Sequence, residues 1–219
     1  MDKLRLRFRK TGRAIYISHL DLMHTMQRGF SRAGYALKYS EGFNPHPQLS
    51  IALPLSVATA SLCEIMDFRL REDTALDELP ARLSAVVPEG IEVIEVYEAQ
   101  RKTAELRWLA VEGVFEYDER GAADMARTLT AFYAQEAIVI TKKTKRGTGE
   151  TDIRPAIRQI AFSAADGGVR VEALISAQEP TLNPELLAEA LRQRSPELAP
   201  DFARFTRVET YDAEMHPYR

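Results

Sequence analysis

The chain has 219 residues, of which 45% are hydrophobic and 28% are charged. This balance is typical of a globular protein and excludes a disordered tail or a fibre. No run approaches the roughly 18 consecutive apolar residues of a membrane span, and the first residues form no apolar signal-peptide core. We therefore expect a cytoplasmic protein with no membrane partner, built as one domain or as two small halves.

Cysteine is nearly absent, since Cys63 is the only one in the chain. A single thiol cannot form an internal disulfide, hold a zinc ion alone or supply the three thiolates of an iron–sulfur cluster. No cofactor is expected in this chain, and any cluster chemistry would belong to a partner.

The net charge is −3, but the charged residues are distributed unevenly along the chain. Residues 1–50 carry nine Lys and Arg against three Asp and Glu, whereas residues 51–100 carry three against ten. Anion binding depends on local clustering of cations rather than on total charge. The N-terminal quarter is therefore where a surface for an anionic ligand is expected.

The first predicted element is a strand, because polar and apolar residues alternate perfectly from residue 3 to residue 9. A period of two places apolar side chains on one face and cations on the other: Leu4, Leu6 and Phe8 against Lys3, Arg5, Arg7 and Arg9. We expect the cations to face the open side of a sheet, available to a polyanion. Glu64 and Asp67 lie in a later strand of opposite charge, and cross-strand pairing with the first strand is expected for them.

A helix is predicted next, from Ser18 as N-cap, through Asp21 in its first turn, to Gly34 as its C-terminal stop. Its buried stripe has spacings of three and four residues and comprises Leu22, Met23, Met26, Phe30 and Ala33.

The remaining elements of the first half are strands at 48–53, 63–70 and 91–97 and a helix at 74–87. The second half follows the same order less clearly, with strands at 106–117, 137–144, 156–163, 169–175 and 205–211 and helices at 122–135 and 183–191. The order strand, helix, strand, strand, helix, strand is that of the ferredoxin-like, or split βαβ, arrangement. The expected fold is α+β, with two tandem ferredoxin-like halves of antiparallel sheet, residues 1–100 and 101–219.

Four ordered runs carry a resemblance to a known family: Arg-Phe-Arg-Lys-Thr-Gly at 7–12, Ile-Ser-His-Leu-Asp-Leu at 17–22, Tyr-Ser-Glu-Gly-Phe-Asn-Pro-His-Pro at 39–47, and Ala-Leu-Pro-Leu at 52–55 followed by Glu64. They resemble the radical SAM-linked domain of unknown function, and the run at 152–155 is similar to a later motif of that family. The resemblance implies a protein fused to, or encoded beside, a radical SAM protein, often one with a cobalamin-binding segment. Because the three-cysteine cluster motif is missing, this chain would be a stand-alone partner; the resemblance implies a context and no reaction.

Candidate catalytic residues lie on the first helix and in the loop after it: His19, Asp21, His24 and His46. His19 falls in the first helical turn, where the helix dipole favours a neutral ring or a bound anion; a helix cap is the alternative. His24, Arg28 and Arg32 are four residues apart on one stripe, which is either a binding face or a solvated one.

The loop 42–47 predicts stiff display of side chains, because prolines flank His46 and Gly42 permits a bend. Phe43, Asn44 and His46 are candidate ligand contacts, unless the loop is only a rigid connection. Asp21, His24 and His46 could share a metal ion, but structural use of these residues is favoured and no metal is predicted.

A second basic locus lies in the C-terminal half and comprises Lys142, Lys143, Lys145 and Arg146, followed by Asp152 and Arg154. Such a hairpin-like connection could clamp phosphates, or it could only aid solubility. Together with the basic first strand, the arginines of the first helix and nearby aromatic residues able to stack on bases, it predicts a polyanion surface.

The expected function is an accessory binding module that presents RNA, or an RNA-linked substrate, to a radical SAM partner. One alternative is a metal-independent RNA-processing or RNA-modifying enzyme, with His19, His24 or His46 as general acid and base, or with Asp21 or Asp152 as nucleophile. A second alternative is a protein-interaction scaffold whose acidic stretch, residues 64–98, docks a basic partner. Whether the chain is an enzyme is left open, with a binding role favoured.

Overall fold

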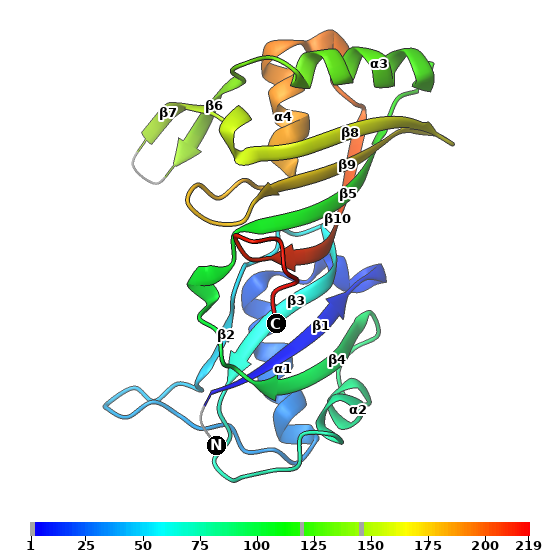
Figure 1. The fold of residues 1–219 in the computed structure, drawn as a ribbon. Coiled ribbons are helices and arrows are strands. Elements are labelled where there is room, and N and C mark those ends of the chain that lie inside the picture. The colour runs from blue at the N-terminus through cyan, green and yellow to red at the C-terminus, as the bar shows by residue number, and fades with distance from the viewer. Residues whose placement is uncertain (1–2, 119–120, 145–146) are drawn as a thin grey trace. The chain divides into compact units, whose positions relative to one another are not determined.

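The computed structural model describes residues 3–118, 121–144 and 147–219 of the chain, apart from the side chains of residues 143 and 144. The chain divides into two compact units, Met1–Thr103 together with Arg219, and Ala104–Tyr218. Each unit combines α-helices with an antiparallel sheet (Figure 1), so the protein has a mixed α+β fold. Within the described residues, no helix is long and apolar enough to cross a membrane.

The first unit contains four strands, two α-helices and one 3-10 helix: β1 (Leu4–Lys10), η1 (Gly12–Tyr16), α1 (His19–Arg32), β2 (Leu49–Ile51), β3 (Ala60–Phe68), α2 (Leu79–Ser84) and β4 (Ile91–Glu98). The strands lie in the order β4-β1-β3-β2 and pair antiparallel throughout. The helix predicted at 74–87 is shorter than expected, because Pro80 has no N–H to donate and is tolerated only in a first helical turn.

The core of the first unit confirms the predicted faces of β1 and α1. Leu4, Leu6 and Phe8 are fully buried and belong to one cluster with the apolar stripe of α1. In this cluster the ring centroid of Phe30 on α1 lies 4.8 Å from that of Phe68 on β3. The predicted N-cap is confirmed as well, since Ser18 Oγ accepts a hydrogen bond of 3.2 Å from the backbone N–H of Asp21.

The second unit contains β5 (Trp108–Glu116), α3 (Ala122–Tyr133), β6 (Val139–Thr144), β7 (Gly147–Asp152), β8 (Ile157–Ala165), β9 (Gly168–Ser176), α4 (Glu185–Arg194) and β10 (Phe202–Tyr211), with the 3-10 helices η2 (Thr103–Glu105) leading into the unit, η3 (Arg154–Ala156) and η4 (Pro196–Leu198). Its main sheet has the order β10-β5-β9-β8, again antiparallel. β6 and β7 form a separate two-stranded sheet. The sequence did not predict β7, because all its residues are exposed and it therefore lacks an apolar alternation.

Aromatic packing holds the core of the second unit. Phe162 of β8 lies between two rings, with its centroid 6.3 Å from that of Phe115 and 5.2 Å from that of Tyr133 on α3. The Tyr133 hydroxyl donates a hydrogen bond to the carbonyl of Leu187 on α4, and burial raises the pKa of this phenol far above its ordinary value. The ring therefore remains a neutral structural donor that links the two helices.

Candidate functional site

The cations of β1 are engaged in ion pairs, so the expectation that they face an open surface is wrong. Their partners lie on both neighbouring strands: Lys3 Nζ is 2.5 Å and Arg5 Nε 2.6 Å from Asp67 of β3, while Arg7 Nη1 is 2.8 Å from Glu95 and Arg9 Nη1 3.1 Å from Glu92 of β4. Arg5 is 0% and Arg7 8% exposed. The physical reason is register, since each arginine stands directly opposite its acid in the ladder. Arg5, Arg7 and Arg9 therefore pair with acids of the neighbouring strands instead of being presented to a ligand.

Asp67 confirms the predicted cross-strand pairing and is the centre of this network. Its two carboxylate oxygens accept from Arg5 at 2.6 and 3.3 Å. Arg5 also donates to the carbonyl of Arg101 at 2.9 Å, so the segment after β4 crosses this face of the sheet. Burial likewise raises the pKa of Tyr97 on β4 to about 12. The centre of this face, at Arg5 and Arg7, is thus interior, whereas Lys3 and Arg9 towards its two ends stay partly exposed.

The acidic stretch 64–98 contains ten acids, of which four are used inside the unit. Glu64 and Asp67 are buried at 1% and 3% exposure, and Glu92 and Glu95 pair with β1. The other six acids of the stretch are exposed, so the scaffold alternative keeps most of its carboxylates: Glu72, Asp73, Asp77, Glu78, Glu89 and Glu98.

The candidate residues on α1 serve mainly the ends of that helix. The Ser18 hydroxyl donates to the Asp21 carboxylate at 2.7 Å, which makes Asp21 part of the N-cap. Arg32 donates to the carbonyl of Val86 at 2.5 Å. His24 and Arg28 are exposed on the helix and His19 is partly exposed. In the portion of the chain that is described, no group of three or more His, Cys, Asp or Glu side chains is placed to hold a metal ion.

The predicted stiff loop is the outer part of a longer projection, residues 38–48, which we call the arm (Figure 1). Its two sides are joined by an antiparallel bridge between Tyr39 and Pro47. Ser40 N–H donates to the His46 carbonyl at 2.8 Å and Gln48 N–H to the Lys38 carbonyl at 2.8 Å. The peptide bonds before Pro45 and Pro47 are trans. The arm is thus a hydrogen-bonded ribbon rather than an irregular loop.

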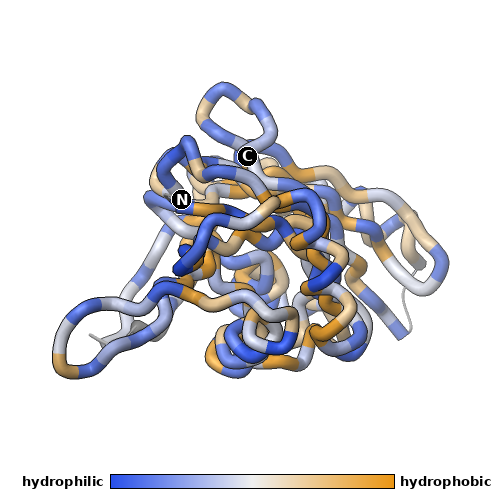
Figure 2. Tube along the Cα trace, turned by 90° about the horizontal axis from the view of Figure 1, so that it is seen from below, coloured by the Kyte–Doolittle hydropathy of each residue, from blue (hydrophilic) through white to orange (hydrophobic). Residues whose placement is uncertain are grey.

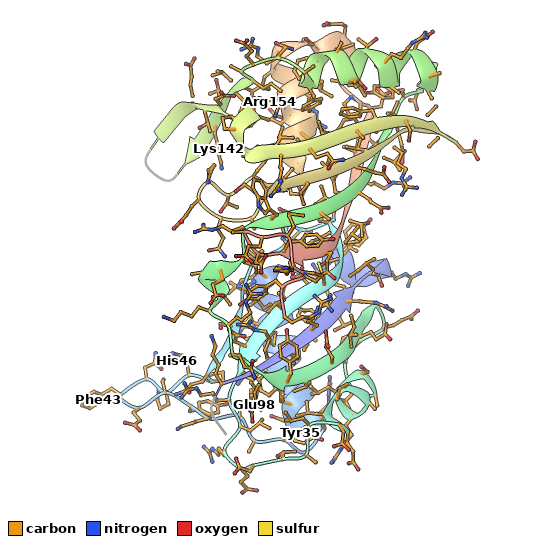
Figure 3. The ribbon with its side chains drawn as sticks, in the orientation of Figure 1. Tyr35, Phe43, His46, Glu98, Lys142 and Arg154 are labelled. Atoms are coloured by element: carbon orange, nitrogen blue, oxygen red, sulfur yellow. The ribbon has the colours of Figure 1, made fainter. Side chains whose placement is uncertain are left out.

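Phe43 lies at the outer end of the arm with 110% relative exposure (Figure 3). Figure 2 shows the same contrast along the chain, with a hydrophobic segment at the end of a mostly hydrophilic projection. The base of the arm is anchored, since Gln27 of α1 donates to the Tyr39 hydroxyl at 3.1 Å and the Arg71 guanidinium lies 6.0 Å from the Tyr39 ring centroid. The Phe43 ring is therefore exposed to solvent at the end of an arm whose base is anchored to the first unit.

His46 lies nearer the body of the unit and is oriented by Ser40 (Figure 3). Ser40 Oγ accepts from the His46 backbone N–H at 3.1 Å and lies 2.9 Å from His46 Nδ1. One Oγ lone pair accepts the backbone N–H, and the hydroxyl hydrogen can be donated to Nδ1. The competing contact, from Nδ1 to the Asn44 carbonyl, is longer at 3.4 Å. We infer that Nδ1 accepts and that Nε2 carries the proton of the neutral ring.

This assignment predicts the Nε2–H tautomer of neutral His46 in nitrogen-15 NMR spectra of the imidazole. Replacing Ser40 by alanine removes the donor to Nδ1, so the two tautomers should then be populated more evenly. The exposed His24 provides the reference, because its signals should be the same in both proteins. Spectra of the unmodified protein dominated by Nδ1–H would contradict the assignment.

An open groove of about 540 Å³ lies at the base of the arm. Three separate segments line it: Lys3 before β1, residues 46–50 of the arm and β2, and residues 67–69 at the end of β3. Among the three candidate histidines, His46 lines this groove and His19 and His24 do not. Sequence reasoning missed Gln48 and Arg69 as members of the site, because a backbone hydrogen bond between residues far apart in the chain brings them together.

In the second basic locus, Asp152 and Arg154, which were expected to contact a ligand, form hydrogen bonds to the local backbone. The Asp152 carboxylate accepts from the backbone N–H groups of Ile138 at 2.8 Å and Arg154 at 3.0 Å. Arg154 donates from its guanidinium to the carbonyl of Ile157 at 2.8 Å. Lys142 lies on β6 and is partly exposed. Lys145, Arg146 and the side chain of Lys143 lie outside the described residues.

These features define a mixed α+β protein with an aromatic-tipped arm beside a polar groove. The chain belongs to the family described as "Uncharacterized protein conserved in bacteria (DUF2344)", whose model matches residues 3–184. That match includes the whole arm and every residue that lines the groove. No curated protein matches the chain.

Proposed function

We propose that this protein is an accessory binding module of a radical SAM system that presents RNA, or an RNA-linked substrate, to its partner enzyme. The observation that carries the proposal is Phe43, a fully exposed ring on an anchored arm. Proteins bind single-stranded nucleic acid by stacking unpaired bases on aromatic side chains next to polar and cationic groups. The arm offers the ring, and Lys3, His46 and Arg69 lie in the groove at its base.

The topology supports two tandem ferredoxin-like halves as the scaffold of this module. In each unit the fourth strand neighbours the first, followed by the third and the second: β4-β1-β3-β2 and β10-β5-β9-β8. In each unit one helix follows the first strand and another follows the third. This is the element order of the split βαβ arrangement. The hairpin β6–β7 would then be an insertion before the second strand of the C-terminal half.

The radical SAM partner in this proposal rests on the resemblance of the motifs at 17–22 and 39–47. The composition is compatible with it, because one buried cysteine cannot bind an iron–sulfur cluster. In this arrangement the partner supplies the cluster and the reaction, and the present chain supplies the contact to the substrate.

Phe43→Ala is expected to weaken binding of single-stranded RNA about tenfold, since stacking of one base on an aromatic ring contributes about 1–3 kcal/mol. Fluorescence anisotropy with labelled RNA at low salt measures the dissociation constant, and affinity should fall steeply as salt is raised. With a radical SAM protein of the same genome added, the RNA should enter a ternary complex.

Phe202→Ala is the matched control, because Phe202 is another exposed aromatic residue, at 67%, in the other unit. Its affinity should equal that of the unmodified protein. If the unmodified protein binds no RNA at low salt, or if the two variants bind equally, the proposal fails. RNA recovered cut or modified after incubation with this chain alone would favour the enzymatic alternative.

A further inference from the structure

Among the residues that the structure describes, the lining of the groove at the base of the arm has a surplus of positive charge, although it includes one acid. Asp67 already binds two cations, Arg5 through both carboxylate oxygens and Lys3 at 2.5 Å. One carboxylate cannot neutralise both, and it has no charge left to offset Arg69, which also lines the groove. The local balance therefore favours an anionic ligand.

Arg69 is positioned for such a ligand by its backbone and not by its side chain. Its carbonyl accepts from Lys38 N–H at 2.8 Å, and its own N–H donates to the Gln48 carbonyl at 3.1 Å. These bonds fix the main chain between the two sides of the arm. Its guanidinium makes no hydrogen bond or ion pair with any residue that the structure describes. The backbone of Arg69 is therefore fixed while its guanidinium is not engaged. The planar guanidinium can then donate two hydrogen bonds to one anionic ligand.

Residues with neutral donors complete the lining. His46, Gln48 and Ser50 belong to the same groove, and the Gln48 side-chain amide also donates to the Tyr39 carbonyl at 3.4 Å. An arginine fork combined with neutral N–H and O–H donors is the composition that proteins use to bind phosphate oxygens. The volume of about 540 Å³ is large enough for a ligand of several hydrogen-bonding groups.

We propose that this groove is a phosphate subsite that binds the phosphate of one nucleotide unit, with Arg69 as its principal contact. The inference rests on the proposed function, because it names the part of the RNA that the first unit would hold beside the arm. It also stands on separate residues, since Phe43 is not among the residues that line the groove.

The test is titration of the full chain with adenosine 5′-monophosphate, adenosine and inorganic phosphate. Isothermal titration calorimetry measures each dissociation constant, and NMR shifts of the backbone amides locate the binding site. The monophosphate should bind at least about tenfold more tightly than adenosine, with shifts at residues 46–50 and 67–69, because a charge-assisted bidentate contact is lost in the nucleoside. Arg69→Gln should weaken binding of the monophosphate by a similar factor. Inorganic phosphate should bind more weakly than the monophosphate.

Arg9→Gln is the matched control, because it removes the same charge at the opposite end of β1, where Arg9 pairs with Glu92. It should leave binding of the monophosphate unchanged, and unaltered NMR spectra away from the groove would show that Arg69→Gln is folded. Equal affinities for adenosine and its monophosphate, or for Arg69→Gln and the unmodified protein, overturn the subsite. Inorganic phosphate that binds as tightly as the monophosphate overturns the nucleotide assignment.

The two proposals fail separately. Binding of the monophosphate that depends on Arg69, in a protein that binds no RNA, retains the subsite and removes the RNA function. RNA binding that depends on Phe43 but is unaffected by Arg69→Gln retains the function and removes the subsite.

Discussion

Asp67→Ala is expected to lower the free energy of unfolding by about 3–5 kcal/mol, because it removes one partner of a buried ion pair with Arg5. Arg5 is 0% exposed and binds both carboxylate oxygens of Asp67, so the variant takes two hydrogen bonds from a buried guanidinium. Lys3 loses the same partner but is 42% exposed and can be hydrated. Urea denaturation followed by circular dichroism measures the loss.

Glu92→Ala is the control, since it removes an acid from the same sheet face at an exposed pair. Arg9 and Glu92 are 48% and 59% exposed, and ion pairs of this kind contribute at most about 1 kcal/mol. The double variant Arg5→Met with Asp67→Leu should recover much of the stability, because apolar side chains replace both buried charges. Equal losses in Asp67→Ala and Glu92→Ala would show that burial of the pair is not what matters.

The same residues show how far the fold could be predicted from sequence. Alternation over residues 3–9 correctly predicted that Leu4, Leu6 and Phe8 lie in the core, because side-chain direction in a strand follows from its period of two. It could not predict the surroundings of the other face. Those depend on which strands flank β1 and in what register, and the acids opposite Arg7 and Arg9 lie more than 80 residues away.

The candidate site was predictable where its cause is local. Prolines around His46 and the glycine at 42 indicated a stiff segment that displays Asn44 and His46, but they did not show that Phe43 is fully exposed. The groove beside it could not be predicted, because Arg69 reaches it through backbone bonds to Lys38 and Gln48. The backbone contacts of Asp152 could not be predicted for a related reason. A carboxylate that caps a turn and one that contacts a ligand look the same in sequence, and only its bonds to Ile138 and Arg154 distinguish them.

Gly90→Ala is expected to destabilise the protein by about 3 kcal/mol or more, because two separate costs add at this position. Gly90 has φ +88, a conformation that costs an alanine about 1–2 kcal/mol. An added Cβ would also lie 2.3 Å from the Thr11 carbonyl oxygen and 2.9 Å from the Ala14 Cβ. Thr11 N–H donates to the Gly90 carbonyl at 2.8 Å, so relieving the clash breaks the bond that ties the turn before β4 to the segment after β1.

Gly34→Ala separates these two costs, since Gly34 has φ +84 but ample space. The nearest atom to an added Cβ there is a guanidinium nitrogen of Arg82 at 3.6 Å, an ordinary contact. Only the conformational cost of about 1–2 kcal/mol should therefore appear in urea denaturation. The difference between the two variants measures the close approach of Gly90 to Thr11. If both variants lose the same stability, the turn before β4 can shift to accommodate the added Cβ at no further cost. The pairing of Glu92 and Glu95 with β1 then does not depend on the close contact between Gly90 and Thr11.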